Sequence, residues 1–400
     1  MSTRPAWRVV FARTVNDATI ASFDCEISKL SRYVSPKVGE LQIQIPVPNY
    51  DVGRDAVLIL NGAGKTSMYV YRDGEIWWGG FMDDVSISGA GDYPVVVVSG
   101  AAFEAYPDRR EARTDEMLSM EQTQYAKWAW DYMQKERGGN ILVETPNPRP
   151  SGRSREFEIK RSDIKTVGSI LKEVSNRADG FEWVIDCFND DAGARRRVLT
   201  TGYPIIGRPD SGIILTFPGD VIDYDIQTSA LDGATSFQAR GKAPDPVGTP
   251  GTPGNVDGSG GSGKAAEKQP PIMSSIFIND DLLAQGYTLT DTTIDRPTVT
   301  EVSTLDDWAK LARELRSGPL SLPSVTCRID NFTQSILGST VTLRINDYLW
   351  PTGPTGEPGY QTSVRVIGYE VDPGELGADD IVRLTFEDNA DKDNLKRSPD

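Results

Sequence analysis

Residues 39–47 (GELQIQIPV) decide the fold class, because apolar and polar residues alternate strictly along them. On a β-strand this period of two places Leu41, Ile43, Ile45 and Val47 on one face and the polar side chains on the other. A strand with one apolar and one polar face is typical of an antiparallel sheet that has a solvent-exposed side. The first part of the chain is therefore expected to be antiparallel β.

The flanking segments extend this sheet. Residues 56–60 (AVLIL) predict a strand, a turn follows at Asn61-Gly62, and residues 67–72 predict the next strand. Asp73-Gly74 predicts a tight hairpin into residues 75–78, since this dipeptide tolerates the positive φ of primed turns. Four consecutive valines within residues 93–99 predict a strand that is buried on both faces.

The middle of the chain combines helices with strands. Ser119 and Gln122 form a capping-box signature, and the aromatic residues after them recur at helical spacing until Gly138-Gly139. A second helix is expected from Ser162 or Asp163 onwards, and residues 181–186 predict a strand directly after it. The apolar stripe of this second helix consists of Ile164, Val167, Ile170, Leu171 and Val174.

β character returns after residue 215. It is interrupted at residues 243–271, a run of Pro, Gly, Ser, Thr and Asp that cannot bury apolar surface and predicts a flexible loop. Residues 304–317 predict a helix that Gly318-Pro319 closes. We therefore expect an α+β, mainly β chain, with β domains at 1–105 and 216–400 and a mixed α+β insertion of two small subdomains at 106–215.

The composition excludes several classes of protein. The chain has 400 residues, a formal net charge of −16 from 42 Lys and Arg against 58 Asp and Glu, and no histidine. Without histidine, Ser-His-Asp and Cys-His hydrolysis, His-ligated zinc and imidazole acid–base chemistry are excluded. The acidic balance argues against a broad nucleic-acid-binding surface, but it is compatible with a conduit along which DNA slides without sticking.

Targeting and redox signals are weak. No apolar run approaches the length of a membrane span, and the N-terminus lacks the layout of a signal peptide. Cys25, Cys187 and Cys327 lie far apart and are odd in number. This pattern predicts reduced thiols that are buried as small hydrophobic groups rather than a disulfide framework.

Three short motifs have both a chemical and a structural interpretation. Gly64-Lys65-Thr66 ends like a P-loop, but Ile59 stands where that motif needs glycine and a strand follows, so a turn is favoured. Arg195-Arg196-Arg197 is either a contact for phosphate or an acidic partner, or a solvated hairpin end, and the hairpin end is favoured. The three-residue glycine spacing within residues 353–359 predicts a hairpin loop rather than a collagen-like segment.

Adjacent carboxylates raise the possibility of glycosidase chemistry. Such an enzyme needs two carboxylates that face each other across a sugar, roughly 5–10 Å apart. Adjacent residues on a strand point to opposite faces, and pairs in turns are usually solvated, so a structural role is favoured and catalysis stays open. The pairs are Asp83-Asp84, Asp190-Asp191, Asp280-Asp281 and Asp379-Asp380.

Two tryptophan pairs, Trp77-Trp78 and Trp128 with Trp130, predict either a sugar platform or a protein contact. On a strand, Trp77 and Trp78 point to opposite faces, so at most one of them lies in the domain's core. The other is then covered by a neighbouring domain or subunit, or exposed for binding. A protein contact is favoured, because tryptophan is enriched at interfaces.

The order of these segments resembles the tail hub proteins (minor tail or baseplate hub proteins) of long-tailed bacteriophages. The resemblance covers nearly the whole chain except residues 243–271. The matching segments are residues 39–43 (GELQI), 70–80 (VYRDGEIWWGG), the helix-to-strand unit at 167–185, and residues 337–343 (LGSTVTL), 366–371 (VIGYEV) and 382–386 (VRLTF).

The resemblance implies two tube-type β-barrel domains separated by smaller α+β domains. It implies that three copies form a homotrimeric ring of six barrels with pseudo-sixfold symmetry, which continues the tail tube and links the distal tail ring to a central fibre or spike. The implied partners are a distal tail protein, a tape-measure protein and a central fibre or spike protein, while DNA passes through the channel without specific binding. The implied location is the virion, at the phage tail tip, after synthesis in the host cytoplasm.

The resemblance also implies a structural protein rather than an enzyme, so no catalytic residue, cofactor or metal is expected. Some hub proteins of this type carry a C-terminal peptidase or lysozyme domain, and none is expected here because the chain stops at Asp400. The alternative is a carbohydrate-active or sugar-binding β-rich tail protein that uses carboxylates and exposed tryptophans.

Overall fold

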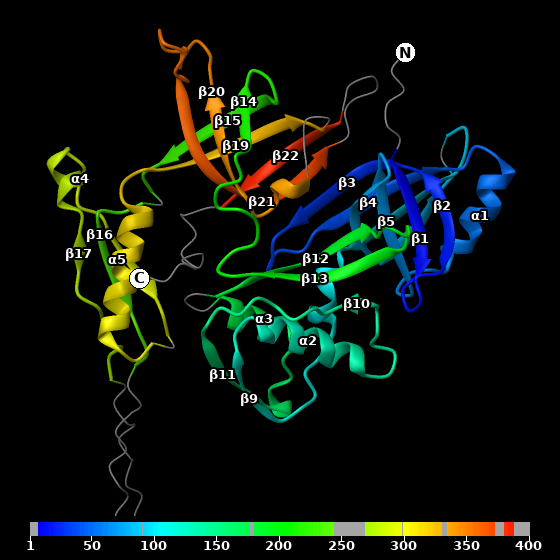
Figure 1. The fold of residues 1–400 in the computed structure, drawn as a ribbon, viewed down its shortest axis with the longest axis horizontal. Helices are drawn as coiled ribbons and strands as arrows, with labels where there is room; N and C mark the ends of the chain where they lie inside the picture. The colour runs from blue at the N-terminus through cyan, green and yellow to red at the C-terminus, as the bar shows by residue number, and fades with distance from the viewer. Residues whose placement is uncertain are drawn as a thin grey trace, which may run out of the picture. The chain divides into compact units, whose positions relative to one another are not determined.

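The computed structural model describes residues 7–89, 91–176, 180–231, 233–243, 269–297, 299–329, 334–372 and 380–387. These residues belong to two compact units (Figure 1). Unit 1 comprises the chain up to Ile226 and the segment Pro323–Glu387, and unit 2 contains Gln227–Leu322. Most of the flexible loop predicted at residues 243–271 lies outside the described residues.

A ten-stranded sheet runs through unit 1. Its main path has the strand order β15-β19-β22-β21-β3-β4-β8-β7, and β20 pairs with both β21 and β14 beside that path. The strands are β3 (Glu26–Tyr33), β4 (Glu40–Pro46), β7 (Asp84–Ser88), β8 (Val95–Ala101), β14 (Ile214–Phe217), β15 (Val221–Ser229), β19 (Leu320–Arg328), β20 (Thr340–Ile345), β21 (Tyr360–Asp372) and β22 (Ile381–Phe386).

Strand β21 unites the two ends of the chain within this sheet. Its first half pairs with β20, and its second half pairs with β22 on one side and β3 on the other. The pairing with β3 places Gly368 opposite Tyr33 and Val371 opposite Leu30. The β regions predicted at the start and the end of the chain are therefore confirmed, and they share one sheet.

A second sheet, of four strands, faces the first part of the large one. Its order is β2-β1-β5-β6, with β1 (Arg8–Arg13), β2 (Thr19–Asp24), β5 (Thr66–Arg72) and β6 (Glu75–Phe81). The predicted hairpin between β5 and β6 is confirmed, since Asp73 and Gly74 have φ values of 53° and 82°. Among the described residues the sheets have open strand orders, so the mainly β class is confirmed and the two tube-type barrels stay a prediction.

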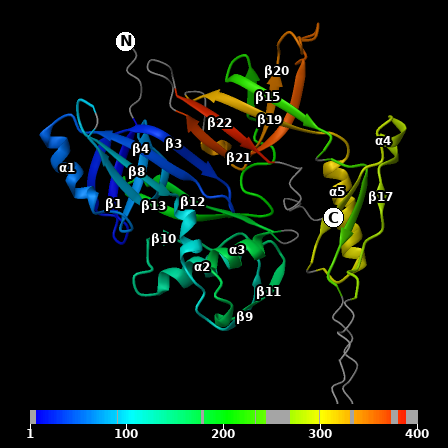
Figure 2. The same cartoon turned by 180° about the vertical axis from the view of Figure 1, so that it is seen from behind.

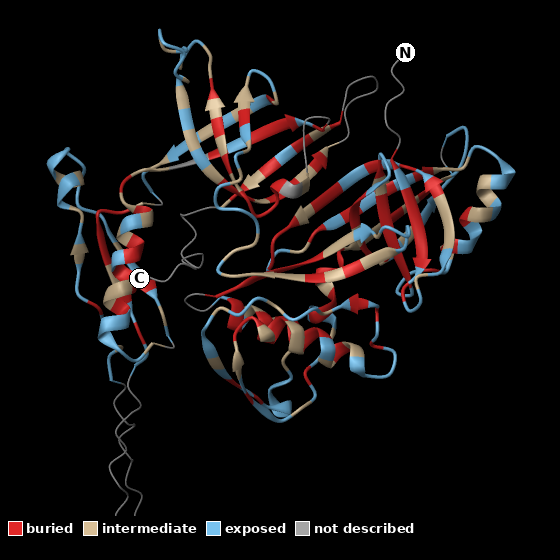
Figure 3. Ribbon diagram, viewed as in Figure 1, coloured by how far each residue is buried: buried red, intermediate tan, exposed pale blue. Residues whose placement is uncertain are grey.

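Both faces of the four-stranded sheet are covered. Val9, Phe11, Met68 and Val70 belong to a core that also contains Leu41 and Ile43 of the large sheet, together with apolar residues of β20, β21 and β22. Tyr69 and Phe81 belong to a second core, formed with the middle of the chain. Figure 3 accordingly draws β1 as buried over most of its length.

The segment at residues 56–60, predicted as a strand, is instead the second half of helix α1 (Tyr50–Leu60). The Asn49 side chain caps this helix by accepting a 3.1 Å hydrogen bond from the Val52 backbone N–H. Ala56 and Ile59 lie three residues apart and are buried on one face. A five-residue apolar run has no periodicity that distinguishes a strand from a helix, so the prediction was wrong.

The predicted valine strand is β8, and its residues are not buried on both faces. Only Val96 and Val98 are buried, while Val95 and Val97 are partly exposed. β8 lies between β4 and the outermost strand β7, and one face of the sheet stays open to solvent there. Apolar composition alone therefore overestimated the burial of this strand.

The middle of the chain forms the second core. Helices α2 (Gln124–Lys135) and α3 (Val167–Ser175) lie against the hairpin of β12 (Glu182–Asn189) and β13 (Arg195–Gly202), as both views show (Figures 1 and 2). The other elements are η1 (Phe103–Arg109), β9 (Glu116–Glu121), β10 (Val143–Glu144), β11 (Ser154–Ile159) and η2 (Arg161–Asp163).

Both predicted helices of this region exist, but they start later than expected. Ser119 lies in strand β9, and Thr123, the residue before α2, makes no capping hydrogen bond with its side chain. Thr166 is the true cap of α3 and accepts a 3.1 Å bond from the Ser169 N–H. Ile164 has φ 49° and is exposed, so it does not belong to the buried stripe.

Unit 2 is a small α/β layer. Its sheet has the order β17-β16-β18, with β16 (Ser236–Arg240), β17 (Phe277–Ile278) and β18 (Asp291–Asp295). The predicted helix at 304–317 is confirmed as α5 (Val302–Arg316), which buries Leu305, Trp308 and Leu311. A shorter helix, α4 (Asp280–Ala284), precedes β18. Within the described residues, no helix combines the length and apolar character that a membrane span requires.

Candidate functional site: a buried joint within unit 1

Three stretches of the chain meet inside unit 1, and polar side chains cross both boundaries between them. The first stretch contributes β1, β3 and β6, the middle contributes β12 and β13, and the C-terminal stretch contributes β21 and β22. We call this set of contacts the joint. Its residues are the structural candidates for function, because they determine how the β regions are held together.

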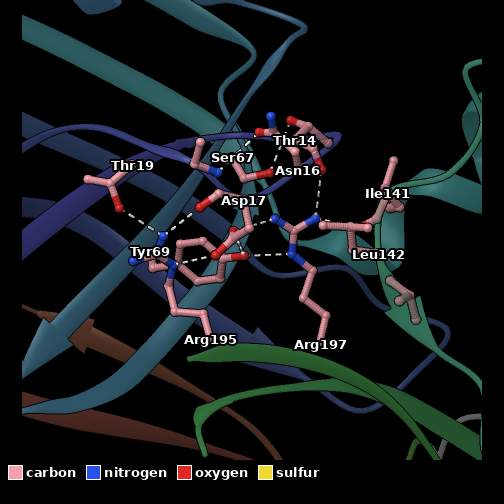
Figure 4. A network of polar contacts seen from close by, with 12 residues as sticks. Thr14, Asn16, Asp17, Thr19, Ser67, Tyr69, Ile141, Leu142, Arg195 and Arg197 are labelled. Atoms are coloured by element: carbon pink, nitrogen blue, oxygen red, sulfur yellow. Dashed lines mark hydrogen bonds and ion pairs between the residues drawn. The ribbon is translucent and has the colours of Figure 1, made fainter. Parts of the chain in front are cut away.

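Arg197 is the buried centre of the first polar network, shown in Figure 4. Its Nε donates to the Tyr69 hydroxyl at 2.6 Å, and its Nη2 donates to Asp17 Oδ1 at 2.9 Å. Its Nη1 donates to the carbonyl oxygens of Thr14, at 3.2 Å, and of Ile141. One guanidinium therefore connects β13 to the turn between β1 and β2, to β5, and to the segment before β10.

The other two arginines of the predicted basic run also have acidic partners. Arg195 donates from Nε to Asp17 Oδ2 and from Nη2 to the Asp17 carbonyl, each at 2.8 Å. Arg196 forms ion pairs with Glu144 and with Asp190. Hydrogen bonds from the Ala194 backbone and from Arg196 lower the pKa of the Asp190 carboxyl.

The run was predicted as a solvated hairpin end: it does begin at the hairpin end, where Arg195 and Arg196 are partly exposed, but Arg197 is buried. The three arginines lie on β13, paired with β12, while the turn of that hairpin comes before them. Two of their partners, Asp17 and Glu144, are distant in sequence and only the tertiary structure brings them close, whereas Asp190 lies in the turn of the same hairpin.

A second network joins the middle of the chain to the C-terminal stretch. Arg365 on β21 and Glu182 on β12 form an ion pair whose side chains are only 3% and 2% exposed. Arg365 also donates from Nε to the Gly338 carbonyl at 2.9 Å, and Glu182 accepts a 2.9 Å bond from the Ile206 N–H. Such additional bonds compensate for the loss of hydration that a buried pair suffers.

A third network joins β3 to the middle of the chain. Arg32 on β3 donates to Asp186 Oδ1 at 2.7 Å, and Glu104 of η1 accepts a 2.8 Å bond from the Ile185 N–H. Burial raises the pKa of the Glu104 carboxyl, although the nearby Arg32 guanidinium opposes this shift. Arg32, Glu104 and Trp78 line a small cavity between β3, β6 and β12.

The tryptophans of β6 form the aromatic part of the joint. Trp77 and Trp78 are both buried in the core shared by the two sheets, so the prediction that they point to opposite faces was wrong. Trp78 pairs with Val70 whereas Ile76 pairs with Tyr71, which leaves Trp77 as the extra residue of a β-bulge. The bulge interrupts the alternation, and both indoles turn toward the same core.

Trp77 is covered by residues from both ends of the chain. Its ring makes edge contacts with Trp7, at a centroid distance of 5.5 Å, and with Tyr369 of β21, at 6.3 Å. The Trp7 indole N–H donates to Asp380 Oδ2 at 2.8 Å. Residues of the same core, from both ends of the chain, thus cover this tryptophan, so neither a neighbouring domain or subunit nor solvent does.

The second tryptophan pair, Trp128 with Trp130, does not form a shared aromatic surface. Trp130 is fully buried in the second core. Trp128 is partly exposed and stacks on Tyr132, with centroids 5.5 Å apart and an interplanar angle of 19°.

The P-loop-like segment is a turn followed by a strand, as predicted. Gly64 has φ 75°, and Thr66 is the first residue of β5. A phosphate-binding loop requires a helix at this point, whose backbone N–H groups would face the ligand.

Three of the carboxylate pairs have a member with a hydrogen-bond partner, and the fourth lies at a helix N-terminus. Asp83 accepts both Nη groups of Arg109 at 2.7 Å, and Asp190 accepts backbone bonds inside its own turn. Asp280 and Asp281 lie in the first turn of α4, where carboxylates complement the helix dipole. Asp380 accepts the Trp7 N–H, and its neighbour at 379 lies outside the described residues.

The cysteines behave as buried apolar groups. Cys25 and Cys327 are buried, and burial raises the pKa of each thiol to about 12. Cys187 lies on β12, where its sulfur packs so closely on Gly79 of β6 that a Cβ at that glycine would lie 2.6 Å from it. The glycine therefore permits the close approach of β6 to β12.

Sequence reasoning missed the pairs Arg365–Glu182, Arg32–Asp186 and Trp7–Asp380. Each joins residues more than 150 positions apart, with no local pattern to mark them. A single arginine within a β-strand pattern carries no signal of its own unless it is known to be buried.

Comparison with known proteins gives matches only among solved structures. No protein-family model matches the chain, and neither does any curated protein. The 43 kDa tail protein of prophage MuSo2 from Shewanella oneidensis matches with a TM-score of 0.56 and 13% identity, over 96% of this chain and 98% of that one. A tail protein from Neisseria meningitidis matches with a TM-score of 0.54 and 12% identity, over 98% and 99%.

A third structure, the prophage tail protein gp18 from Listeria monocytogenes, matches with a TM-score of 0.51 and 11% identity, over 97% and 96%. At these identities the likeness concerns the fold. The chain thus has the fold of solved prophage tail proteins, as its resemblance to tail hub proteins predicted.

Proposed function

We propose that this protein is a structural component of a phage tail and that it acts as the tail hub. The observation that carries the proposal is the position of β21, which joins strands from the first and last parts of the chain in one sheet over a shared core. One chain then supplies two β regions side by side. Three copies would supply the six that a pseudo-sixfold ring requires.

In this proposal residues 1–105 and 216–400 contribute the two tube-type barrels, and residues 106–215 are the insertion between them. The homotrimeric ring sits at the distal end of the tail, in the virion, after synthesis in the host cytoplasm. It continues the tail tube and links the distal tail ring to a central fibre or spike. Its neighbours are a distal tail protein, a tape-measure protein and the fibre or spike protein.

The role is one of assembly, and DNA passes through the ring without specific binding. A channel that lets DNA slide must offer few unpaired cations to the phosphates. The net charge of −16 supports this, and so do the ion pairs that neutralise the densest basic run.

The carbohydrate-active alternative has less support. It relied on exposed tryptophans and facing carboxylates, whereas Trp77, Trp78 and Trp130 are buried. Asp83, Asp190 and Asp380 of its candidate pairs bond to Arg109, to turn backbone and to Trp7, respectively. We therefore propose no catalytic residue, metal or cofactor.

The mass of the protein in solution tests the proposal. One chain has a mass of 43.8 kDa, so light scattering on a sizing column should give about 131 kDa at several concentrations. Negative-stain images of that fraction should show rings with threefold symmetry. A monomer at every concentration would refute autonomous ring formation, and a mass shift with added glycan would favour the sugar-binding alternative.

A further inference from the structure

A small cavity lies inside the joint, where β3, β6, β12 and the start of η1 meet. Arg32, Trp78 and Glu104 contribute its polar groups, and Ala102 and Ile185 belong to its apolar lining. The volume open to a water-sized sphere is about 10 Å³, which is room for a single water molecule. A cavity of this size with several polar groups in its wall is typical of a site for buried water.

The indole N–H of Trp78 has no protein acceptor in the part of the chain that the structure describes. The residue is only 2% exposed, and the nitrogen itself is buried. Buried N–H groups without a partner are rare in proteins, because such a group loses its hydration and gains no bond in return. Since Trp78 lines the cavity, the cavity is the place from which an acceptor can reach this N–H.

Two side chains of opposite charge line the same cavity and are held in place by β12. Arg32 donates from Nη2 to Asp186 Oδ1 at 2.7 Å and to the Ile185 carbonyl at 3.4 Å. Glu104 accepts the Ile185 N–H through Oε1 at 2.8 Å. A guanidinium has five N–H donors and a carboxylate has about four acceptor positions, so each group is able to bond to a further molecule.

The lining does not suit a metal ion. Cys187 also lines the cavity, and burial raises the pKa of its thiol to about 12, so the sulfur is neutral near pH 7 rather than a thiolate ligand. Among the described residues, no group of three or more His, Cys, Asp or Glu side chains is placed to hold a metal. Arg32 would in addition repel a cation, and Glu104 would repel an anion.

We propose that this cavity binds one water molecule as a structural part of the joint. The water accepts a hydrogen bond from the Trp78 indole and donates one to a carboxyl oxygen of Glu104, while the Arg32 guanidinium supplies a second donor. A neutral molecule that both donates and accepts suits all three side chains, and water is the one that the volume admits.

The bound water connects β6 to β3 and η1, in addition to the bonds that Arg32 and Glu104 already make to β12. Water-mediated bonds of this kind are nearly as favourable in enthalpy as direct ones. The site lies within one copy of the chain, so the inference does not depend on the proposed tail hub or on its oligomeric state.

Water-selective NMR on the full chain with isotope-labelled tryptophan tests the site. The Trp78 indole N–H should show a nuclear Overhauser contact with water, and its sign in the rotating frame distinguishes a bound water from proton exchange. Trp78→Phe identifies the resonance by removing it. A Trp78 N–H without any contact to water would overturn the proposal.

Trp130 is the matched control within the same protein. Its indole N–H is likewise buried and has no acceptor among the described protein groups, but it belongs to the second core and does not line this cavity. An apolar core excludes water, so the Trp130 N–H should show no such contact. Equal contacts for both indoles would overturn a specific water site at Trp78.

A displacement variant locates the water. Ala102 lines the cavity and is 4% exposed, so Ala102→Val adds bulk to the cavity wall. The contact between Trp78 and water should disappear in Ala102→Val and persist in Ala112→Val, which adds the same bulk at a 3% exposed alanine of the second core. The other indole signals verify that both variants are folded, and a contact that persists in folded Ala102→Val would overturn the proposed position.

A crystal structure at a resolution that shows ordered water tests the site without any variant. Density for one water is expected within hydrogen-bond distance of both Trp78 Nε1 and the Glu104 carboxyl group. A cavity without such density, or density that is out of reach of Trp78 Nε1, would overturn the proposal.

Discussion

At the scale of single residues, a few buried arginines bridge distant parts of the chain. Arg197 connects β13 to four groups in the first half and middle of the chain, and Arg365 joins β21 to Glu182. A buried guanidinium has lost its hydration and depends on every one of these bonds. Removing one partner therefore lowers the free energy of unfolding by more than the intact pair contributes to it.

Arg365→Met should destabilise unit 1 by about 3–5 kcal/mol, because it leaves the Glu182 carboxylate buried without its cation. The double variant Arg365→Met with Glu182→Leu should recover most of that loss, since neither charge of the buried pair then remains and Glu387, the other partner of Arg365, is 20% exposed. The control Arg383→Met removes a half-exposed partner of Asp372 and should cost less than about 1 kcal/mol. Thermal unfolding of all three checks this, and equal losses for Arg365→Met and Arg383→Met would contradict it.

At the scale of elements, one hydrogen bond ties the loop between β20 and β21 to strand β15. Tyr224 on β15 donates to Asp347, and this bond raises the pKa of the Tyr224 phenol to about 12 and lowers that of the Asp347 carboxyl. The phenol is protonated in the bonded state. Its contribution to stability is therefore complete below the ordinary tyrosine pKa of about 10 and is lost as the pH rises through 12.

Asp347→Asn should return the Tyr224 pKa toward about 10, since the amide cannot hold the phenol proton as a carboxylate does. The NMR titration of ring-labelled tyrosine measures this directly, and Tyr224→Phe identifies the resonance. A Tyr224 pKa that stays near 12 in Asp347→Asn would show that the hydrogen bond does not cause the shift. The pKa of the Asp347 carboxyl is shifted in the opposite direction, downward. Its contribution to stability is therefore present above its unfolded pKa of about 4 and is lost as the pH falls through its lowered pKa.

The β-bulge of β6 is a second feature at this scale. A regular strand would place Trp77 on the face opposite Trp78, away from Tyr369. The extra residue instead brings both indoles to one core, where Trp77 meets Trp7 and Tyr369. The packing of the first and last β regions thus depends on a local irregularity of one strand.

At the scale of the whole molecule, the net charge predicts weak attraction to nucleic acid. The protein carries −16, and the arginines of its densest basic run are paired with carboxylates. Fluorescence anisotropy with a labelled duplex should show no binding at protein concentrations up to about 10 μM in physiological salt. Saturable binding that weakens steeply with salt would contradict the proposed channel, because it would reveal a phosphate-binding surface.

Elements with a clean period or a strong turn signal could be predicted from local sequence patterns. The alternation at residues 39–47 predicted β4, Asp73-Gly74 predicted the hairpin of β5 and β6, and the stripe of residues 304–317 predicted α5. These signals are local, because the side chains that define a strand face or a helix stripe lie within a few residues of each other. The order of these elements also predicted the fold of tail proteins.

The secondary structure of short apolar runs and the burial of isolated polar residues depend on tertiary contacts. Residues 56–60 form a helix because Asn49 caps it and Ala56 and Ile59 find a core on one side, which a five-residue run does not specify. Arg197 is buried, and Arg195 and Arg196 are ion-paired, because Asp17 and Glu144 arrive from other elements. Burial and ion pairing depend on residues that are distant in sequence, and a local sequence pattern does not show which of them become neighbours.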